Sequence, residues 1–456
     1  MYLNKLSRYL NIDQDILYSI ALKLWSVIKT PLSFYFITQY LTIDEQGYWY
    51  TFINLGALSV FAELGFTTII TQYVSHEFAH LELNRNKRLT GSSEALEKII
   101  SLIKFTFKVY SYLIPLGIII LSFVGVLFFS KYDAYSSITL AWIVYAFTGG
   151  LTLLVSYVGA LLQGLDKVKE VLKINLISGF LSVFSIWISL YFNLKLWALS
   201  VGGFVLIIST LVLYINQLGP LYFQISKFKI KTKFSWFKEI MPLQIKFSLS
   251  WISSYFVFYF AVPITMYFLG AEEAGRLGIS ISITTAMLHL AHAWISTKTP
   301  LLNMLVSKRE FGLMDQKFNS LHSSSIIVFI VISIILLLIY IYIFPIFTLN
   351  YRFLTLLQLS ILLCAELPKL IYGNLAVYLR AFKVEPFLHV SIITAILTVV
   401  ALVIGLYFFE SLTTGLILYM IVQYVALFAG LIIFRNFKNN RLKMVALIDE
   451  NVVNNS

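Results

Sequence analysis

Four lysines lie inside segments that are otherwise apolar. They are Lys23, Lys29, Lys246 and Lys369. Each lies in a stretch of roughly 20 to 28 residues, which is long enough to cross a bilayer as a helix. A charge at the centre of a membrane span costs roughly 2.5 to 3.5 kcal/mol, so such residues tend to face a polar cavity. We therefore interpret the lysines as candidate ligands of a charged substrate.

Two acids and two histidines accompany these lysines inside the apolar segments, namely Glu63, Glu366, His289 and His292. The lysines outnumber the acids, which favours an anionic passenger. Glu366 lies three residues before Lys369, so the two can also simply neutralise each other on one helix. Glu63 has two readings, as a group that couples transport to protons or as the counter-ion of Lys29.

His289 and His292 share one helical face, as two metal ligands would. Nothing near them in the sequence completes a zinc set, so we expect no metal site. A role in proton binding or hydrogen bonding fits the histidines better. The chain also has no glycine-rich phosphate loop, no Walker motif and no nucleophile elbow. We therefore expect no cofactor, and a protein that is not an enzyme.

Composition identifies the elements that must position these residues. Of the 456 residues, 59% are hydrophobic and 12% are charged, and the mean hydropathy is +0.84. Typical soluble chains carry about 25% charged residues. No polar stretch is long enough for a soluble domain, and the single cysteine, Cys364, excludes an intramolecular disulfide framework. The composition predicts an all-α, polytopic membrane protein.

Twelve apolar segments have the length and composition of membrane-spanning helices. We expect them at residues 16–41, 47–73, 105–130, 136–163, 171–192, 196–216, 240–269, 274–298, 321–345, 353–379, 387–409 and 412–434.

The basic residues predict the orientation of these spans. The N-terminus, the even-numbered loops with their flanks and the C-terminus hold 26 of the 34 lysines and arginines. The odd-numbered loops hold only Lys131, Lys195, Arg276 and Arg352. The positive-inside rule then places both termini in the cytoplasm. It also accounts for the net charge of +12 without a nucleic-acid partner, while the Lys227–Lys233 run could contact anionic membrane lipids.

Short internal matches predict two parallel six-helix halves. The segment Ile37–Gly47 matches Ile264–Gly275 with one inserted residue, and Leu161–Val168 resembles Tyr378–Val384. Such halves suit alternating access to a substrate site between them. The expected organisation is a cytoplasmic segment at 1–15, a first half at 16–216, a basic linker at 217–239, a second half at 240–434 and a cytoplasmic tail at 435–456.

Polar side chains recur on one face of several expected helices. Ser19, Lys23 and Ser26 in the first span correspond to Lys246, Ser250 and Ser253 in the seventh, 227 residues later. A stripe of small polar residues alone is equally consistent with helix–helix packing. A lysine on the same face makes a hydrated cavity the better interpretation.

The stretch from Glu45 to Leu81 resembles the signature of Wzx-type O-antigen flippases. Its matching parts are Glu45-Gln46-Gly47, Glu63-Leu64-Gly65, Gln72 and Ser75-His76-Glu77. These flippases belong to the multidrug/oligosaccharidyl-lipid/polysaccharide exporter superfamily, which also holds MATE exporters and the lipid II flippase MurJ. The resemblance implies a MATE/MurJ-like fold.

The resemblance also implies a substrate, partners and a location. The substrate would be an oligosaccharide, the O-antigen repeat unit of lipopolysaccharide, on undecaprenyl diphosphate. It would move from the cytoplasmic to the periplasmic leaflet of a bacterial inner membrane. Partners would be a polysaccharide polymerase and a chain-length regulator. A diphosphate carries about two negative charges and needs cations at membrane depth, which agrees with the lysines.

Two other functions remain open at this stage. A MATE-like cation or drug antiporter has the same architecture, but it would favour an acidic cavity. A membrane polysaccharide polymerase or glycosyltransferase generally needs a sizeable periplasmic loop or a catalytic acid at the membrane surface. The longest outer loops expected here are only about 5 to 8 residues long, a typical length for connections between neighbouring helices.

The charge asymmetry generates a topology prediction. Reporter fusions in the odd-numbered loops should report the periplasm, and fusions in the even-numbered loops and the tail should report the cytoplasm, because basic loops are retained inside. The periplasmic fusion points are Lys131, Lys195, Arg352 and Glu410, and the cytoplasmic ones are Arg88, Lys169, Lys231, Arg309, Lys383 and Lys438. A periplasmic signal from Lys231 would refute both the span count and the repeat.

Overall fold

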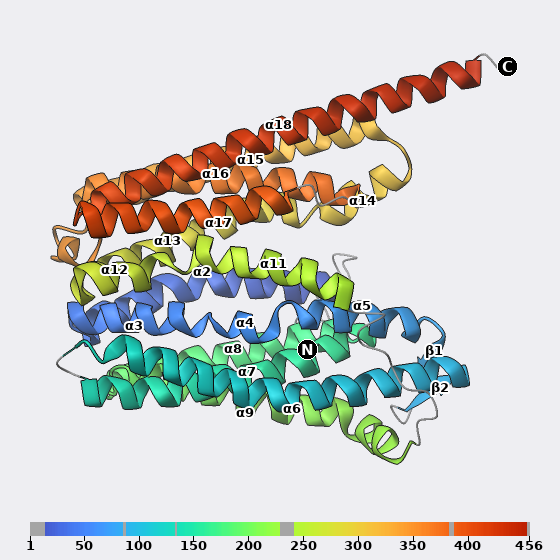
Figure 1. Cartoon of the computed structure of the whole chain (residues 1–456), viewed down its shortest axis with the longest axis horizontal. Coiled ribbons are helices and arrows are strands. Elements are labelled where there is room, and N and C mark those ends of the chain that lie inside the picture. Colours follow the sequence, from blue (N-terminus) through green and yellow to red (C-terminus); the bar gives the residue numbers. More distant parts are fainter. Residues whose placement is uncertain (1–13, 85–87, 133–134, 229–240, 383–386, 454–456) are drawn as a thin grey trace. The chain divides into compact units, whose positions relative to one another are not determined.

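The computed structural model describes residues 14–84, 88–132, 135–228, 241–382 and 387–453. Within these ranges the chain is almost entirely helical (Figure 1). The one sheet there is an antiparallel hairpin of β1 (Leu81–Leu83) and β2 (Leu89–Gly91). Long apolar stretches with few helix breakers form helices, as expected from their composition. The prediction of an all-α, polytopic fold is confirmed.

The helices follow one another along the chain with short connections. The first are α2 (Gln14–Tyr40), α3 (Ile43–Gly56), α4 (Ser59–Glu63), α5 (Phe66–Phe78), α6 (Ser93–Phe129), α7 (Tyr135–Gly164), α8 (Val168–Tyr191) and α9 (Trp197–Lys227). The others are α11 (Met241–Phe258), α12 (Ala261–Leu269), α13 (Ala271–Ser296), α14 (Thr299–Ser307), α15 (Phe311–Tyr342), α16 (Leu356–Ala381), α17 (Leu388–Val403) and α18 (Leu412–Val453).

Within the described residues, nine helices are long and apolar enough to cross a membrane. A tenth span is formed if Trp251–Phe258 and Ala261–Leu269, which meet at a bend of 47°, count as one. The second expected span, at 47–73, was predicted as one continuous helix, and this prediction is wrong. It is divided into α3, α4 and α5, and between α4 and α5 the backbone turns left-handed at Leu64 and Gly65.

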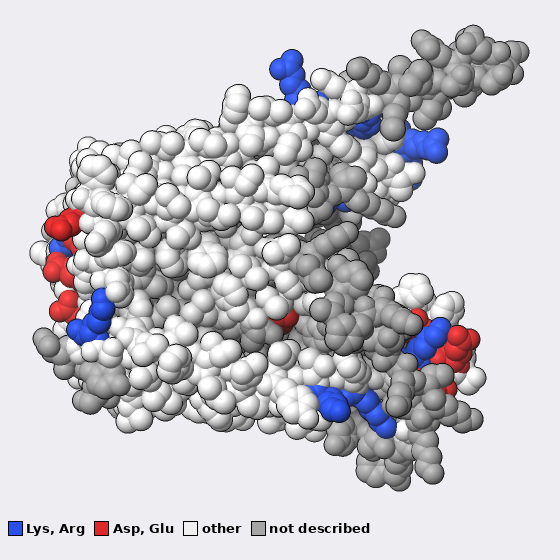
Figure 2. Space-filling model, in the orientation of Figure 1, with Lys and Arg blue, Asp and Glu red and all other residues white. Residues whose placement is uncertain are grey.

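Many of the charged residues that the structure describes lie near the ends of the helices. On the face seen in Figure 2, lysines, arginines and acids gather at both ends, and the surface between them is almost free of charge. Large apolar side chains such as Ile119, Phe123, Ile334 and Phe428 are exposed along the long helices α6, α15 and α18. This distribution is typical of a multi-pass membrane protein, whose outer surface faces lipid.

The chain divides into two compact units, Met1–Tyr255 and Phe256–Ser456. The division falls within α11, and α9 continues as far as Lys227, into the expected linker. Residues 229–240 of that linker lie outside the described residues. The bounds of the two six-helix halves therefore stay a prediction.

The two units repeat one set of helix neighbours. In the first unit α6 packs on α7, α5 on both of these, α7 on α9, α8 on α9, and α2 on α8. In the second unit α15 packs on α16, α13 on both of these, α16 on α18, α17 on α18, and α12 on α17. Each of these pairings in the first unit thus has a counterpart in the second, in the same chain order. This correspondence supports the internal repeat inferred from the short sequence matches.

The matching segments Ile37–Gly47 and Ile264–Gly275 form the same local structure, in which one helix ends and the next begins within a few residues. In the first unit Thr42 caps α3 through a capping box with Glu45, whose carboxylate also pairs with Lys195 at 2.7 Å. In the second unit Arg276 pairs with Glu272 and Glu273 at 2.5 and 2.9 Å. Acidic side chains in the first turn of a helix stabilise it, because the N-terminal end of the helix dipole is positive.

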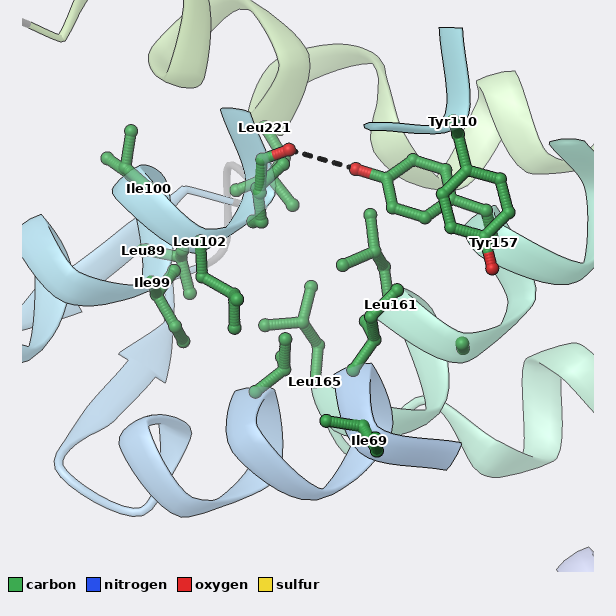
Figure 3. Packing of buried hydrophobic residues seen from close by; sticks show 14 of the residues in the cluster. Ile69, Leu89, Ile99, Ile100, Leu102, Tyr110, Tyr157, Leu161, Leu165 and Leu221 are labelled. Carbon is green, nitrogen blue, oxygen red and sulfur yellow. Dashed lines mark hydrogen bonds between the residues drawn. The ribbon is translucent and has the colours of Figure 1, made fainter. Parts of the chain in front are cut away.

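A buried cluster holds together one end of the first unit (Figure 3). Side chains of α5, α6, α7 and α9 meet there with the hairpin, and Ile69, Ile99 and Leu165 are almost wholly buried. Within it the Tyr157 hydroxyl donates to the carbonyl of Ile103 at 3.0 Å. The side-chain amide of Gln224 joins the hairpin to α9, because it donates to and accepts from the backbone of Leu89 at 2.8 Å each.

Within the second unit, a group of charged and polar side chains, here called the ionic clamp, holds α18 against α15 and α16. The Arg441 guanidinium binds both carboxylate oxygens of Asp315 at 2.7 and 3.1 Å, and it donates to the Tyr378 hydroxyl at 2.6 Å. Tyr378 in turn donates to Asp315 at 2.5 Å, and Lys438 lies 3.3 Å from the same carboxylate. A bidentate arginine–carboxylate pair is geometrically specific, so the clamp joins α15, α16 and α18 in one arrangement.

Candidate functional site

The break between α4 and α5 is the feature around which the first unit's site is built. Leu64 has φ 50° and Gly65 has φ 74°, both in the left-handed region. Glycine adopts this conformation without steric cost, which is why a helix can be interrupted and restarted here. The break leaves the carbonyl of Leu64 without its helical partner. The side-chain amide of Gln244, from α11, donates to that carbonyl at 2.7 Å.

Gln244 matters because lipid offers no hydrogen bonds. A non-helical backbone group at membrane depth is tolerated only where protein or a water-filled cavity satisfies it. The Ser248 hydroxyl, one turn further along α11, is 3.5 Å from the same oxygen and adds a weak second contact. The sequence reasoning placed Glu63-Leu64-Gly65 within one helix and therefore missed Gln244, whose role depends on the break.

Glu63 is the last residue of α4 and faces a pocket in the first unit. The Thr67 hydroxyl, on the far side of the break, donates to its carboxylate. The side chain is half-buried. Within the described residues no ion pair joins Glu63 to Lys29. The structure therefore shows no contact that supports Glu63 as the counter-ion of Lys29. The proton-coupling role of Glu63 stays a prediction.

The pocket has a volume of about 540 Å³, within the usual range for a site of a small organic ligand. Its lining comes from α4, α5, α7, α8, α9 and α11, and most of it can form hydrogen bonds. The polar lining residues are Glu63, Thr67, Thr68, Thr71, Gln72, Ser156, Gln163, Asn175, Tyr214 and Trp251.

The charge of this pocket differs from the sequence expectation. Glu63 is the one carboxylate among the described lining residues, and none of them is a lysine, arginine or histidine. Hydroxyls, amides and an indole ring are groups that bind sugar hydroxyls and sugar faces. The pocket is therefore suited to a neutral polyhydroxy group or to a cation, and a diphosphate would need cations from elsewhere.

Of the three candidate lysines on α2 and α11, the structure describes the side chain of only one. Lys29 lies on α2 and is half-buried. Lys23 and Lys246 lie in α2 and α11, but their side chains are outside the described part of the structure. On α2, Ser33 accepts a hydrogen bond from the indole of Trp187 at 3.1 Å, so part of the polar stripe serves helix packing.

Lys369 and Glu366 form a buried ion pair in the second unit. Their Nζ and Oε1 atoms are 2.6 Å apart, and the side chains are 10% and 2% exposed. The Lys369 ammonium also donates to the Tyr419 hydroxyl at 3.0 Å and lies 5.0 Å from the ring centre of Phe258. The neutralising interpretation of this pair is thus what the geometry shows.

His292 belongs to a polar cluster that the sequence reasoning only half recognised. Its Nδ1 is 2.9 Å from the side-chain oxygen of Asn374. The side-chain nitrogen of Asn374 contacts Nδ1 of His322 at 3.3 Å and Oγ of Ser325 at 3.2 Å. His289 is exposed, one turn before His292, and interacts electrostatically with Glu366 and Lys369. A polar residue such as Asn374 amid apolar neighbours was the available signal.

The structure thus divides the predicted site residues between two places. Glu63 lies in the pocket of the first unit, whereas Glu366, Lys369, His289 and His292 lie together in the second. Among the described residues no group of three or more histidine, cysteine or acidic side chains could hold a metal ion.

Neither a protein-family model nor a curated protein sequence matches the chain. Solved structures do. The lipid II flippase MurJ in an inward closed conformation aligns with a TM-score of 0.68 at 14% identity, covering 95% of this chain and 92% of MurJ. A multidrug resistance MATE transporter of the MOP superfamily, inward-facing, aligns with a TM-score of 0.59 at 13% identity, covering 94% and 96%.

A third similar structure is a MOP superfamily transporter from Pyrococcus furiosus, described as having a binding pocket of reverse polarity that suggests a different function. It aligns with a TM-score of 0.56 at 12% identity, covering 92% of this chain and 93% of that one. At these identities the likeness concerns the fold. Over nearly its whole length, the chain has the fold shared by the MurJ flippase and the MATE transporters of the MOP superfamily.

Proposed function

We propose that this protein is a flippase for an undecaprenyl-diphosphate-linked oligosaccharide, an O-antigen repeat unit. It moves the polar head from the cytoplasmic to the periplasmic leaflet of a bacterial inner membrane by alternating access. The observation that carries the proposal is the pocket beside the α4–α5 break. Its lining of amides, hydroxyls and one indole matches the chemistry of a sugar chain.

The pocket supports this substrate in three respects. First, Gln72, Gln163 and Asn175 are exposed, so their amides can exchange water for sugar hydroxyls. Second, Trp251 offers a partly exposed ring face, on which a sugar ring can stack. Third, about 540 Å³ accommodates only part of an oligosaccharide. The polyprenyl tail can stay in lipid while this head crosses.

The diphosphate requires positive charge, which the pocket does not supply. We propose that Lys29, with Lys23 and Lys246 on the helices α2 and α11, provides it. Lys369 is a weaker candidate because Glu366 already neutralises it. A diphosphate could still bind Lys369 by taking the place of the Tyr419 hydroxyl as a hydrogen-bond acceptor.

The energy source is proposed to be an ion gradient, with Glu63 as a proton site and His289 and His292 as a second. The proposed working partners are the membrane lipids, a polysaccharide polymerase and a chain-length regulator, as the resemblance of Glu45–Leu81 implies.

One observation favours a second function, a MATE-like antiporter of cations or drugs. Glu63 is the one charged residue among the described lining of the pocket, and a lone carboxylate attracts a cation more readily than an anion. The exposed ring of Trp251 could stack on a flat organic cation.

Reconstitution separates the two functions. The purified chain in liposomes should move a fluorescent undecaprenyl-diphosphate oligosaccharide between leaflets, measured by quenching from outside, and should not move a cationic dye. Gln163→Ala with Asn175→Ala removes two amides from the pocket and should slow flipping about tenfold, at about 0.5–1.5 kcal/mol for each lost hydrogen bond. The control is Gln39→Ala, an exposed amide on α2 that is outside the pocket. Dye transport without lipid flipping would refute the proposal.

Glu63→Gln tests the coupling, because glutamine keeps the hydrogen bond with Thr67 but cannot change charge. We expect the variant to bind the lipid-linked oligosaccharide and to flip it slowly, without the acceleration that an imposed pH gradient gives the unsubstituted protein. Flipping rates with and without the gradient are the measurement. Normal acceleration in the variant would exclude Glu63 as the proton site.

Lys369→Met should destabilise the protein by about 3–5 kcal/mol, because it leaves the Glu366 carboxylate buried without its partner. The double variant Glu366→Leu with Lys369→Met should recover most of that stability, as measured by thermal unfolding in detergent. If Lys369 contacts the diphosphate, the double variant will fold yet flip more slowly. Flipping at the normal rate would remove Lys369 from the set of substrate ligands.

A further inference from the structure

Three polar side chains in the pocket of the first unit can accept further hydrogen bonds but have no hydrogen left to donate. They are Glu63, Thr67 and Thr71, here called the acceptor row. An ionised carboxylate only accepts. The Thr67 hydroxyl donates its one hydrogen to the Glu63 carboxylate, and the Thr71 hydroxyl donates its own to the carbonyl of Ala160 on α7 at 3.2 Å. Both hydroxyl oxygens keep lone pairs with which they can accept.

The break in the backbone brings these three side chains into one row. Thr67 and Thr71 are about one turn apart on α5, so they lie on the same face of that helix. Glu63 ends α4, and the left-handed turn at Leu64 and Gly65 separates it from α5. The hydrogen bond from Thr67 to Glu63 spans this turn. The acceptors therefore follow one another along α4 and α5.

The amides of the pocket do not favour one kind of ligand group. Gln72, Gln163 and Asn175 each carry an acceptor oxygen and two donor hydrogens, so they bind donors and acceptors alike. No lysine, arginine or histidine is among the described lining residues to offset the charge of Glu63. Selection between ligand groups therefore depends on the acceptor row.

The acceptor row favours ligand groups that carry hydrogen. A sugar hydroxyl or a protonated amine can donate to Glu63, and a hydrogen bond to a charged group is stronger than one between neutral groups. An ionised carboxylate has no hydrogen to donate. Beside Glu63 it would bring two like charges together, which costs more in a partly desolvated pocket than in water. It could accept from Thr67 only if the bond from Thr67 to Glu63 were broken.

We propose that the acceptor row makes this pocket a sugar subsite that selects hydrogen-bond donors. It binds a sugar ring whose groups facing α4 and α5 are hydroxyls or an amine, and it rejects a ring that carries a carboxylate there. This inference rests on the proposed function and narrows its substrate to an oligosaccharide with a neutral or amino sugar at this position. The ring of Trp251 lines the same pocket, is 41% exposed and can cover one face of that sugar.

The same selection determines which part of the lipid-linked head enters the pocket. A diphosphate that links a lipid to a sugar is negatively charged and offers only acceptor oxygens, so the acceptor row disfavours it for the reasons that apply to a carboxylate. The head would therefore bind with its sugar in the pocket and its diphosphate outside, where lysines such as those proposed on α2 and α11 can bind it.

Soluble sugars test the selection without any lipid-linked substrate. The purified full chain, in nanodiscs of zwitterionic lipid, is titrated with the methyl glycosides of glucose, glucosamine and glucuronic acid. These share one ring and differ in charge, and a galactose series with the same three members allows for a preference in stereochemistry. Ligand-observed NMR gives the dissociation constants. We expect the neutral and amino sugars to bind about tenfold more tightly than the acidic one, or better.

Two glutamate variants locate the discrimination. Glu63→Gln replaces one carboxylate oxygen by an N–H donor group, so neutral glycosides should still bind and the preference over the acidic sugar should fall to about threefold or less. Glu77→Gln removes the same charge from α5 outside the described pocket lining, and it should leave the preference unchanged because salt screens distant charges. Trp251→Leu should weaken the neutral and acidic sugars alike, because it removes the stacking surface and no charge.

The unsubstituted protein decides the proposal even if Glu63→Gln fails to fold. Equal affinity for neutral and acidic sugars, or no binding in either series, would overturn it. Binding of the amino sugar alone, at the affinity of tetramethylammonium, would reveal a cation site and would also overturn it. So would an equal loss of preference in Glu63→Gln and Glu77→Gln.

The proposed function is judged separately, by flipping in liposomes. Flipping without the preference for neutral and amino sugars would remove the subsite and leave the function standing. The preference without flipping would leave the subsite standing and remove the function.

Discussion

The absence of water beside the apolar helices is the constraint on which this structure depends. A polar group in that environment must find its partner within the protein, at a cost of several kcal/mol if it does not. The Leu64 carbonyl therefore has Gln244, and the Lys369 ammonium has Glu366 and Tyr419. The indole of Trp142 donates to the Leu121 carbonyl at 3.0 Å, which is possible because Gly125 has no Cβ. A Cβ there would lie 1.9 Å from the indole nitrogen.

The sequence was sufficient to predict most of the fold. A helical, polytopic class followed from hydropathy alone, whereas the two six-helix halves inferred from the match of Ile37–Gly47 with Ile264–Gly275 stay a prediction. What could not be predicted was the break at Leu64 and Gly65. Hydropathy does not register backbone angles, and a single glycine within an apolar run is compatible with a continuous membrane helix.

The candidate site was less predictable than the fold, because it depends on contacts between distant residues. The Glu366–Lys369 pair could be foreseen, since three residues on one helix bring the side chains together. Gln244 and Asn374 could not, because their partners lie 180 and 82 residues away in the chain. Counting lysines also led us to expect a basic cavity, and the pocket that the structure describes is not basic. The first unit has a nearly neutral pocket, and in the second unit Lys369 is already paired.

The Arg441–Asp315 clamp has a practical consequence for measuring motion. It ties the C-terminal part of α18 to α15 and α16, so a dye on the exposed Asn440 reports the displacement of those three helices together. The chain has one cysteine, Cys364, whose replacement by serine leaves a background without thiols. A cysteine introduced in place of Asn440 then provides a single labelling site on the second unit. With a second label on the first unit, energy transfer between the two dyes would report any change in the distance between the labelled positions.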